Sequence, residues 1–132
     1  MKLAVIGGGS TYTPELADGI GRLLPGVDEL TLVDPDLARL SVVGPVSARI
    51  MAAHGHPGRV SWTESLDEGA EGADAILFQL RIGGQAARQR DETWPLYCGC
   101  VGQETTGAGG LAKALRTVPV VLDLAERARR RR

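Results

Sequence analysis

The 132-residue sequence predicts an α/β fold in which helices cover both faces of a parallel β-sheet. Three observations support this prediction. Short apolar runs alternate with helical patterns along the chain. Glycines directly follow the first apolar run, and an aspartate stands at the end of the second apolar run. A chain of this length forms one domain that buries roughly two-thirds of its unfolded surface.

The first predicted strand is Lys2 to Ile6, a short apolar run that ends at glycines, as is typical of a buried parallel strand. Thr13-Pro14-Glu15 is a typical helix start, because it offers a hydroxyl cap, a proline in the first turn and an acid that the helix dipole favours. The helix pattern ends at Pro25-Gly26, and its apolar face carries Leu16, Ile20, Leu23 and Leu24.

The second predicted strand is Leu30 to Asp34, with the acid at its carboxyl end. Asp36 is placed to cap a second helix, which we expect Pro45 to kink or interrupt. Apolar residues recur at helical spacing in that segment, at Leu40, Val43, Val46 and Ile50.

Arg59 to Thr63 and Ala75 to Leu80 are the third and fourth predicted strands. A helix is predicted near Gln85 to Leu96. The last helix is expected from about Leu111, with its regularity broken by Pro119 and with one apolar side that consists of Leu111, Leu115, Val118, Leu122 and Ala125. Four strands with these crossovers fit a Rossmann-type doubly wound sheet in the order 3-2-1-4, of which a fifth and a sixth strand are missing.

Composition excludes several classes of protein. The 15 basic and 16 acidic residues nearly cancel, so no overall field attracts nucleic acid or a membrane. The sequence has no signal peptide and no membrane span, and we expect a cytoplasmic protein. Cys98 and Cys100 are too close for an ordinary disulfide and form no zinc pattern with His54 or His56, so we interpret them as reduced thiols near a loop.

Arginines crowd the end of the sequence. Such a run can bind nucleic acid, but no aromatic residue or second basic cluster accompanies this one. We interpret it as the solvated last turn of a helix, where cations complement the helix dipole. Its members are Arg127, Arg129, Arg130, Arg131 and Arg132.

The glycines after the first strand predict a nucleotide-binding loop. Gly7, Gly8 and Gly9 let the backbone approach a pyrophosphate, whose charge the amides of the following helix N-terminus attract. Tyr12 stands where G-x-G-x-x-G has its third glycine, so the match to that motif is partial. Asp34 follows these glycines at close to the usual spacing of the acid that binds the hydroxyls of an adenosine ribose. A carboxylate there repels the 2′-phosphate of NADP, so the sequence favours NAD. The alternative is that Asp34 only begins a turn.

Arginines follow the fourth strand at the carboxyl edge of the sheet, where ligands bind in such folds. Arg81 or Arg88 could hold an anionic substrate group with its guanidinium fork. Arg88 and Glu92 are also placed to form an ordinary surface ion pair, because they are one helical turn apart.

Glu104 lies in a segment rich in hydroxyls and glycines, Gly102 to Gly110. We interpret this segment as the floor of a substrate pocket, in which Gly107 to Gly110 form a tight turn before the last helix. The alternative is a helix cap that leaves Glu104 as an exposed loop carboxylate.

Together these segments resemble the family 4 glycoside hydrolases, and among them the 6-phospho-β-glucosidases. Tyr12 is part of the resemblance, so the missing third glycine is a family trait. The segments that carry it are Gly7 to Leu16, Gln79 to Gly84, Ala87-Arg88, Asp91-Glu92, Gly102 to Gly110 and Ala114 to Leu122.

The resemblance implies NAD-dependent hydrolysis of a phosphorylated disaccharide or β-glucoside. In that family NAD accepts hydride from sugar C3, a base removes the C2 proton, the aglycone leaves by elimination, water adds, and the hydride returns. A divalent metal, typically manganese, stabilises the developing enolate.

The resemblance also implies the roles of individual residues. Arg88 would hold the sugar 6-phosphate, Glu104 would contact sugar hydroxyls, and Arg81 would lie near the junction of cofactor and substrate. The implied cofactor-binding residues are Gly7, Gly8, Gly9, Ser10, Thr11, Asp34 and Arg81. The metal ligands and the base would lie beyond residue 132. We therefore expect residues 1–132 to be the truncated N-terminal NAD-binding domain of an enzyme that is a homo-oligomer at full length, and to be inactive alone.

Two other functions remain open. The chain could be an NAD-binding module without catalysis, or an NAD-dependent dehydrogenase of the lactate or malate type. Such dehydrogenases use a different arginine loop and need a His-Asp pair further along the chain, and the Gly102 to Gly107 segment argues against them.

Overall fold

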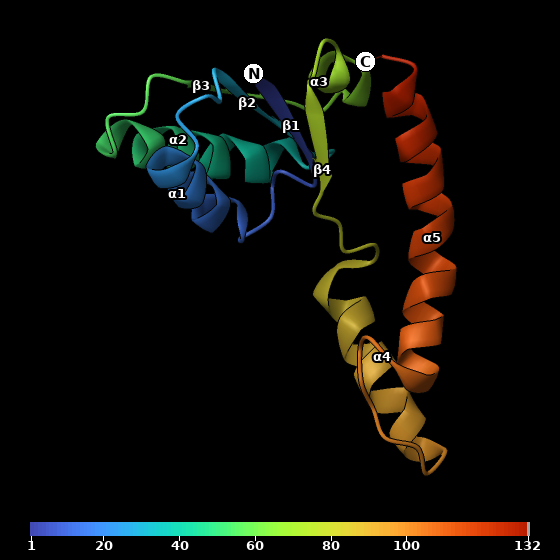
Figure 1. Ribbon diagram of the computed structural model, residues 1–132. Coiled ribbons are helices and arrows are strands. Elements are labelled where there is room, and N and C mark those ends of the chain that lie inside the picture. Colours follow the sequence, from blue (N-terminus) through green and yellow to red (C-terminus); the bar gives the residue numbers. More distant parts are fainter. Residues whose placement is uncertain (132) are drawn as a thin grey trace. The chain divides into compact units, whose positions relative to one another are not determined.

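The computed structural model describes residues 1–131, which form two compact units. One unit consists of Met1–Leu80 and the residues from Glu126 onward, and the other of Arg81–Ala125. The first contains a four-stranded parallel sheet in the predicted order, β3-β2-β1-β4 (Figure 1). The strands are β1 Lys2–Ile6, β2 Glu29–Val33, β3 Arg59–Thr63 and β4 Ala75–Phe78. The helices are α1 Thr13–Leu23, α2 Leu37–Ala53, α3 Leu66–Ala70, α4 Gly84–Tyr97 and α5 Gly107–Arg129.

The register of the sheet aligns the carboxyl ends of three strands. Ile6 at the end of β1 is opposite Val33 of β2 on one side and Phe78 of β4 on the other. The residues that follow these strands therefore meet at one edge of the sheet, and they are Gly7, Asp34 and Gln79.

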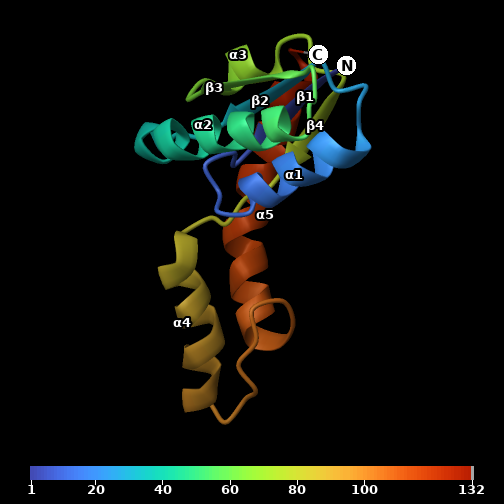
Figure 2. The ribbon, with the colours of Figure 1, turned by 90° about the vertical axis from the view of Figure 1, so that its left-hand side faces the viewer.

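Helices cover both faces of this sheet, as predicted. α1 and α2 pack against each other on one face, and the short helix α3 lies on the other (Figures 1 and 2). The buried apolar cluster joins β1 and β2 to the two longer helices, and it consists of Leu3, Val5, Ala17, Ile20, Val27, Leu30, Leu32, Leu40 and Met51.

The two predicted helix caps had different outcomes. Asp36 caps α2, since its side chain accepts a hydrogen bond from the amide of Arg39. The predicted Thr13 cap is wrong, because Thr13 is already the first residue of α1 and its buried hydroxyl accepts a hydrogen bond from the side chain of Gln79. Pro45 does not interrupt α2.

The helix α3 was not predicted. Ser65 caps it by accepting a hydrogen bond from the amide of Glu68, and Asp67 and Glu68 occupy its first turn. Serine followed three residues later by glutamate is a capping-box pattern, so the sequence did contain a signal for this helix.

The helix α5 begins at Gly107, four residues earlier than predicted, and runs through Pro119 without a break. Gly107 to Gly110 are therefore its first turn and not a separate turn before it. The side expected to be apolar is present but exposed, at Leu111, Leu115, Val118 and Leu122. Neither α5 nor any other helix in residues 1–131 is apolar over a length that could cross a membrane.

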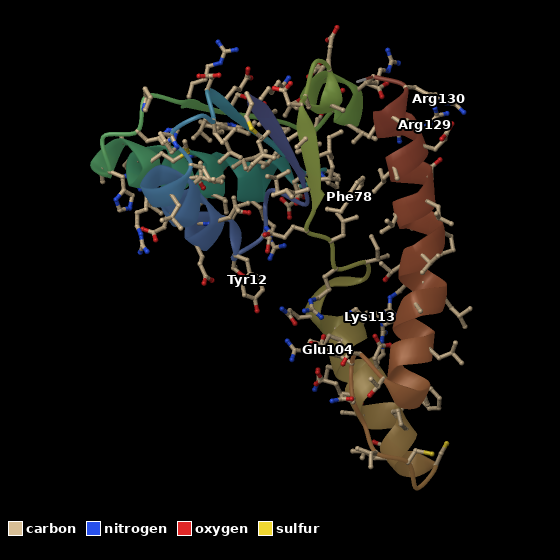
Figure 3. All side chains as sticks on the ribbon, in the orientation of Figure 1. Tyr12, Phe78, Glu104, Lys113, Arg129 and Arg130 are labelled. Atoms are coloured by element: carbon tan, nitrogen blue, oxygen red, sulfur yellow. The ribbon has the colours of Figure 1, made fainter. Side chains whose placement is uncertain are left out.

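The arginines at the end of α5 are solvated, as expected. Arg129 and Arg130 pair with Glu126, and their hydrogen bonds lower the pKa of Glu126 to about 2 (Figure 3). Arg131 pairs with Asp67 of α3. Arg132 lies outside the described residues.

Candidate functional site

The glycine loop after β1 lies directly against its neighbours. The amides of Gly7 and Gly8 both donate to the carbonyl of Val33, at 2.8 and 2.9 Å. Gly7 has φ +89°, and a Cβ there would lie 2.2 Å from the carbonyl oxygen of Gln79. A Cβ on Gly8 would lie 2.7 Å from the Cβ of Leu32. Larger residues would collide with the ends of β2 and β4, so the sheet itself requires the glycines.

Asp34 fixes the same loop from the end of β2. One carboxylate oxygen accepts the amide of Gly9 and the other accepts the amide of Asp36, each at 3.0 Å. The side chain of Asp34 therefore begins a turn, and its role toward an adenosine ribose stays a prediction. The carboxylate also orients the loop that we expect to bind a pyrophosphate.

Ser10 closes the loop onto α1. Its amide donates to the carbonyl of Gly7 at 3.1 Å, and its hydroxyl accepts the amide of Tyr12 at 3.2 Å. Thr11 is exposed beside it. Tyr12, in place of the third glycine of the motif, extends away from the sheet and is 57% exposed (Figure 3). The loop therefore accommodates this tyrosine without burying it.

Gln79 is a residue of this edge that sequence reasoning did not single out. Its amide donates to the carbonyl of Ile6 at 2.8 Å, and its side-chain nitrogen donates to the hydroxyl of Thr13 at 2.9 Å. Gln79 thus joins the end of β4 to the end of β1 and the start of α1. Its position directly after β4, at the carboxyl edge, was the available signal.

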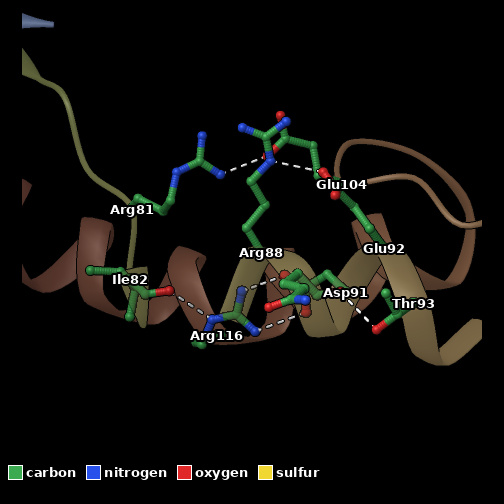
Figure 4. Close-up of polar contacts among 9 residues, drawn as sticks. Arg81, Ile82, Arg88, Asp91, Glu92, Thr93, Glu104 and Arg116 are labelled. Carbon is green, nitrogen blue, oxygen red and sulfur yellow. Dashed lines mark hydrogen bonds and ion pairs between the residues drawn. The ribbon is translucent and has the colours of Figure 1, made fainter. Parts of the chain in front are cut away.

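The second group of predicted residues lies in the Arg81–Ala125 unit. Nη1 of Arg81 donates to Oε2 of Glu104 at 2.6 Å, and Nε of Arg88 lies 3.3 Å from the same oxygen (Figure 4). Nε of Arg88 also donates to Oε1 of Glu92 at 2.8 Å. The structure therefore brings Arg81, Arg88 and Glu104 together, and the predicted Arg88–Glu92 ion pair is present. We call these four residues the arginine cluster.

The arginine cluster keeps Glu104 ionised. The hydrogen bond from Arg81 lowers the pKa of this carboxyl, and the charges of Arg81, Arg88 and Lys113 act in the same direction. An ionised carboxylate only accepts hydrogen bonds. Glu104 is therefore suited to accept hydroxyl donors and unsuited to donate a proton near neutral pH.

The charges of the arginine cluster balance, with two guanidinium groups against two carboxylates. All four side chains are partly exposed, between 23% and 37%. Guanidinium groups bind phosphate and carboxylate in similar geometry, so an entering phosphate would compete with the carboxylates for the same donors. The cluster can therefore exchange an internal carboxylate partner for an external anion.

Metal ligands are a separate matter. Within residues 1–131, no three or more His, Cys, Asp or Glu side chains group so that they could hold a metal ion. Cys98 and Cys100 are exposed free thiols, as expected from the sequence.

Comparison with known proteins gives a family match. The model of the family described as "Family 4 glycosyl hydrolase" matches residues 2–130. A "Probable 6-phospho-beta-glucosidase" of Bacillus subtilis (strain 168) is 43% identical over 131 residues, which cover 96% of this chain and 29% of that protein.

Solved structures agree with this match. The 6-phospho-β-glucosidase of Thermotoga maritima, with NAD and glucose 6-phosphate, has a TM-score of 0.91 and 36% identity over 98% of this chain and 31% of its own. A 6-phospho-α-glucosidase from gut microorganisms, in complex with NAD and Mn²⁺, has a TM-score of 0.91 and 32% identity over 98% of this chain and 30% of its own. The chain spans about 29% of the length of the curated relatives that it matches.

Proposed function

Because this chain belongs to the family 4 glycosyl hydrolases, we propose that it is the NAD-binding part of an enzyme that cleaves 6-phospho-β-glucosides. One observation carries the proposal most directly: Arg81, Arg88 and Glu104 form one cluster, in a chain that also has a glycine loop at the carboxyl edge of its parallel sheet. A site of this kind is suited to a sugar phosphate, since arginines bind the anion and an ionised carboxylate accepts hydroxyl groups.

The cofactor is assigned to the glycine loop. Gly7, Gly8 and Gly9 lie between the end of β1 and the start of α1, where backbone without side chains can approach a pyrophosphate, and this placement supports the assignment. We propose that Ser10 and Thr11, which lead into α1, complete the phosphate contacts. We assign Asp34 to the adenosine ribose, since a carboxylate there repels the 2′-phosphate of NADP.

The substrate is assigned to the arginine cluster. We propose that Arg88 binds the 6-phosphate and that Glu104 accepts hydrogen bonds from sugar hydroxyls. Arg81 orients Glu104 through their 2.6 Å hydrogen bond, and we propose that Arg81 also contacts the cofactor. Glu92, the other partner of Arg88, would release that donor when the phosphate enters.

When bound, NAD would supply a reversible hydride acceptor for oxidation and later reduction at sugar C3. The chain's own residues would bind and orient the two ligands. Residues 1–131 offer no cluster of three or more His, Cys, Asp or Glu side chains that fits a metal ion. We propose that the manganese ligands and the base belong to a part of the enzyme outside residues 1–132, and that the whole enzyme is a homo-oligomer.

Calorimetric titration of the 132-residue chain tests the binding proposal. We expect NAD to bind in preference to NADP, and glucose 6-phosphate to bind in preference to glucose. Binding of NAD without any response to glucose 6-phosphate would favour the non-catalytic module. Binding of a hydroxy acid such as lactate or malate would favour the dehydrogenase.

An activity assay on the product of the complete reading frame tests the reaction. We expect release of 4-nitrophenol from its 6-phospho-β-glucoside only with NAD and Mn²⁺ present. The β preference rests on identity, which is 43% to the Bacillus subtilis protein and 38% to the "Phospho-alpha-glucosidase PagL" of Clostridium acetobutylicum. Faster cleavage of the α-linked substrate would overturn that preference.

A further inference from the structure

Next to the arginine cluster lies an ion pair that no ligand role explains. Asp91 of α4 is nearly buried, with a side chain 4% exposed. Arg116 of α5 reaches it with both terminal nitrogens: Nη2 lies 2.6 Å from Oδ2 and Nη1 lies 3.2 Å from Oδ1 (Figure 4). The two hydrogen bonds together fix the orientation of the guanidinium group as well as its distance from the carboxylate.

The same guanidinium holds a third partner. Nε of Arg116 donates to the carbonyl of Ile82 at 2.9 Å. Ile82 directly follows Arg81 in the chain. Arg116 therefore ties the segment that carries Arg81 to α4, which carries Arg88 one turn before Asp91.

The loop that carries Glu104 is seated on the same part of α4. A Cβ on Gly102 would lie 1.7 Å from the carbonyl oxygen of Glu92, and one on Gly109 would lie 2.2 Å from that of Asp91. These close approaches hold the start of the Glu104 loop and the first turn of α5 against the backbone of α4. Every member of the arginine cluster thus depends on the position of α4 around Asp91.

The pair does not act by exchanging protons. The hydrogen bonds from Arg116 lower the pKa of Asp91, and those to Asp91 raise the pKa of Arg116. Both groups therefore stay charged over the ordinary range of pH. Three of the five N–H groups of the Arg116 guanidinium donate within the protein, one from each nitrogen, which suits this side chain to a structural role.

We propose that Asp91 and Arg116 are a positioning pair that sets the geometry of Arg81, Arg88 and Glu104, and thereby determines affinity for the sugar phosphate. The statement about affinity rests on the proposed function, whereas the statement about geometry does not. Neither residue would touch the substrate.

Two variants test the proposal. Asp91→Asn keeps the size of the side chain and removes its charge, and Arg116→Lys keeps the charge and removes the fork. We expect each to weaken glucose 6-phosphate binding about tenfold or more, because displaced arginine and carboxylate groups lose charge-assisted hydrogen bonds to the ligand. NAD affinity should fall less than glucose 6-phosphate affinity, because Arg81 is the member of the cluster with a proposed cofactor contact and the glycine loop keeps its own hydrogen bonds. Arg90→Lys, an exposed neighbour of Asp91 on α4, is the matched control and should change neither affinity.

A second measurement reads the geometry without any ligand. Nitrogen-15 NMR resolves the Nε–Hε groups of arginines, and that of Arg88 donates to Glu92 in the native cluster. In both variants we expect this group to exchange faster with solvent, while backbone amide signals of β1 and β2 stay in place. The control variant should leave the Arg88 signal unchanged.

The outcomes separate the two claims. If wild type fails to bind glucose 6-phosphate, the proposed function fails, and the Arg88 signal still decides whether the pair positions the cluster. An unchanged Arg88 signal in both variants overturns the positioning role. Loss of the β1 and β2 signals and of NAD binding in both variants also overturns it, since the pair would then support the whole fold and not this cluster.

Discussion

Nη1 of Arg81 lies 2.6 Å from Oε2 of Glu104, although 23 positions of chain separate the two residues. Arg81 follows the last strand of the sheet, and Glu104 lies in the loop between α4 and α5. The sequence singled out Arg81 because it follows the fourth strand, and Glu104 because it lies in the glycine-rich segment Gly102 to Gly110. The structure brings the two side chains into contact. This contact also holds Glu104 as an anion, which is the form that accepts hydroxyl donors.

The first prediction concerns the charge of Glu104. Its folded-state pKa is lowered, so the stabilisation from its pairing is complete above the ordinary pKa of about 4.3 and is lost as pH falls through the lowered value. Arg81→Met should move the midpoint of Glu104 upward. Carbon-13 NMR of the glutamate carboxyl groups between about pH 7 and about pH 2 measures this midpoint. Arg22→Met, which removes an arginine paired with Asp18, should leave it unchanged. A wild-type midpoint at or above the ordinary value would contradict the prediction.

The second prediction compares two glycines. Gly7→Ala should lower the free energy of unfolding by at least about 1–2 kcal/mol, because φ is positive there and the new methyl group would meet the backbone of Gln79. It should also abolish NAD binding. Gly19→Ala in α1 meets nothing within 4 Å and should stabilise the chain by about 0.5–1 kcal/mol. Urea denaturation of both variants measures the difference, and equal effects would show that the loop is not tightly packed.

The third prediction concerns the choice of cofactor. Asp34→Asn keeps the size of the side chain. Asparagine has only one side-chain oxygen, however, whereas the two oxygens of Asp34 accept the amides of Gly9 and Asp36. We expect NAD affinity to fall about tenfold and the preference over NADP to narrow. Asp36→Asn is the matched control, since asparagine caps a helix as well as aspartate does. Fluorescence titration with NAD and with NADP measures the ratio of the two affinities. A wild-type chain that prefers NADP would refute the assignment of Asp34.

The fourth prediction concerns the anion site. Arg88→Met should weaken glucose 6-phosphate binding about tenfold or more, since hydrogen bonds to charged groups contribute about 1.5–3 kcal/mol. NAD binding should not change. Arg90→Met removes an exposed arginine of the same helix and should leave both affinities intact. Equal losses in the two variants would indicate a general effect of charge rather than a site at Arg88.

Much of the first unit could be predicted from local sequence. Apolar runs that end at Gly7 and Asp34 placed the first two strands and the edge where they meet, and the strand order followed from the crossovers. Elsewhere the local signals misled. Thr13 has the side chain of a helix cap, but the side chain of Gln79 donates to its hydroxyl instead. Gly107 to Gly110 resemble a turn, yet they form the first turn of α5, where Gly109 lies close to the backbone of Asp91.

The sequence by itself determined the parallel sheet, the glycine loop and the acid after β2, because periodicity and short spacings encode each of these. The family resemblance came from the motifs themselves. Only the tertiary structure decided that Glu104 pairs with Arg81 and that Asp91 pairs with Arg116. The physical reason is distance along the chain. Partners that are 23 and 25 positions apart leave no periodic trace in the sequence, and their contact depends on how two helices and a loop pack.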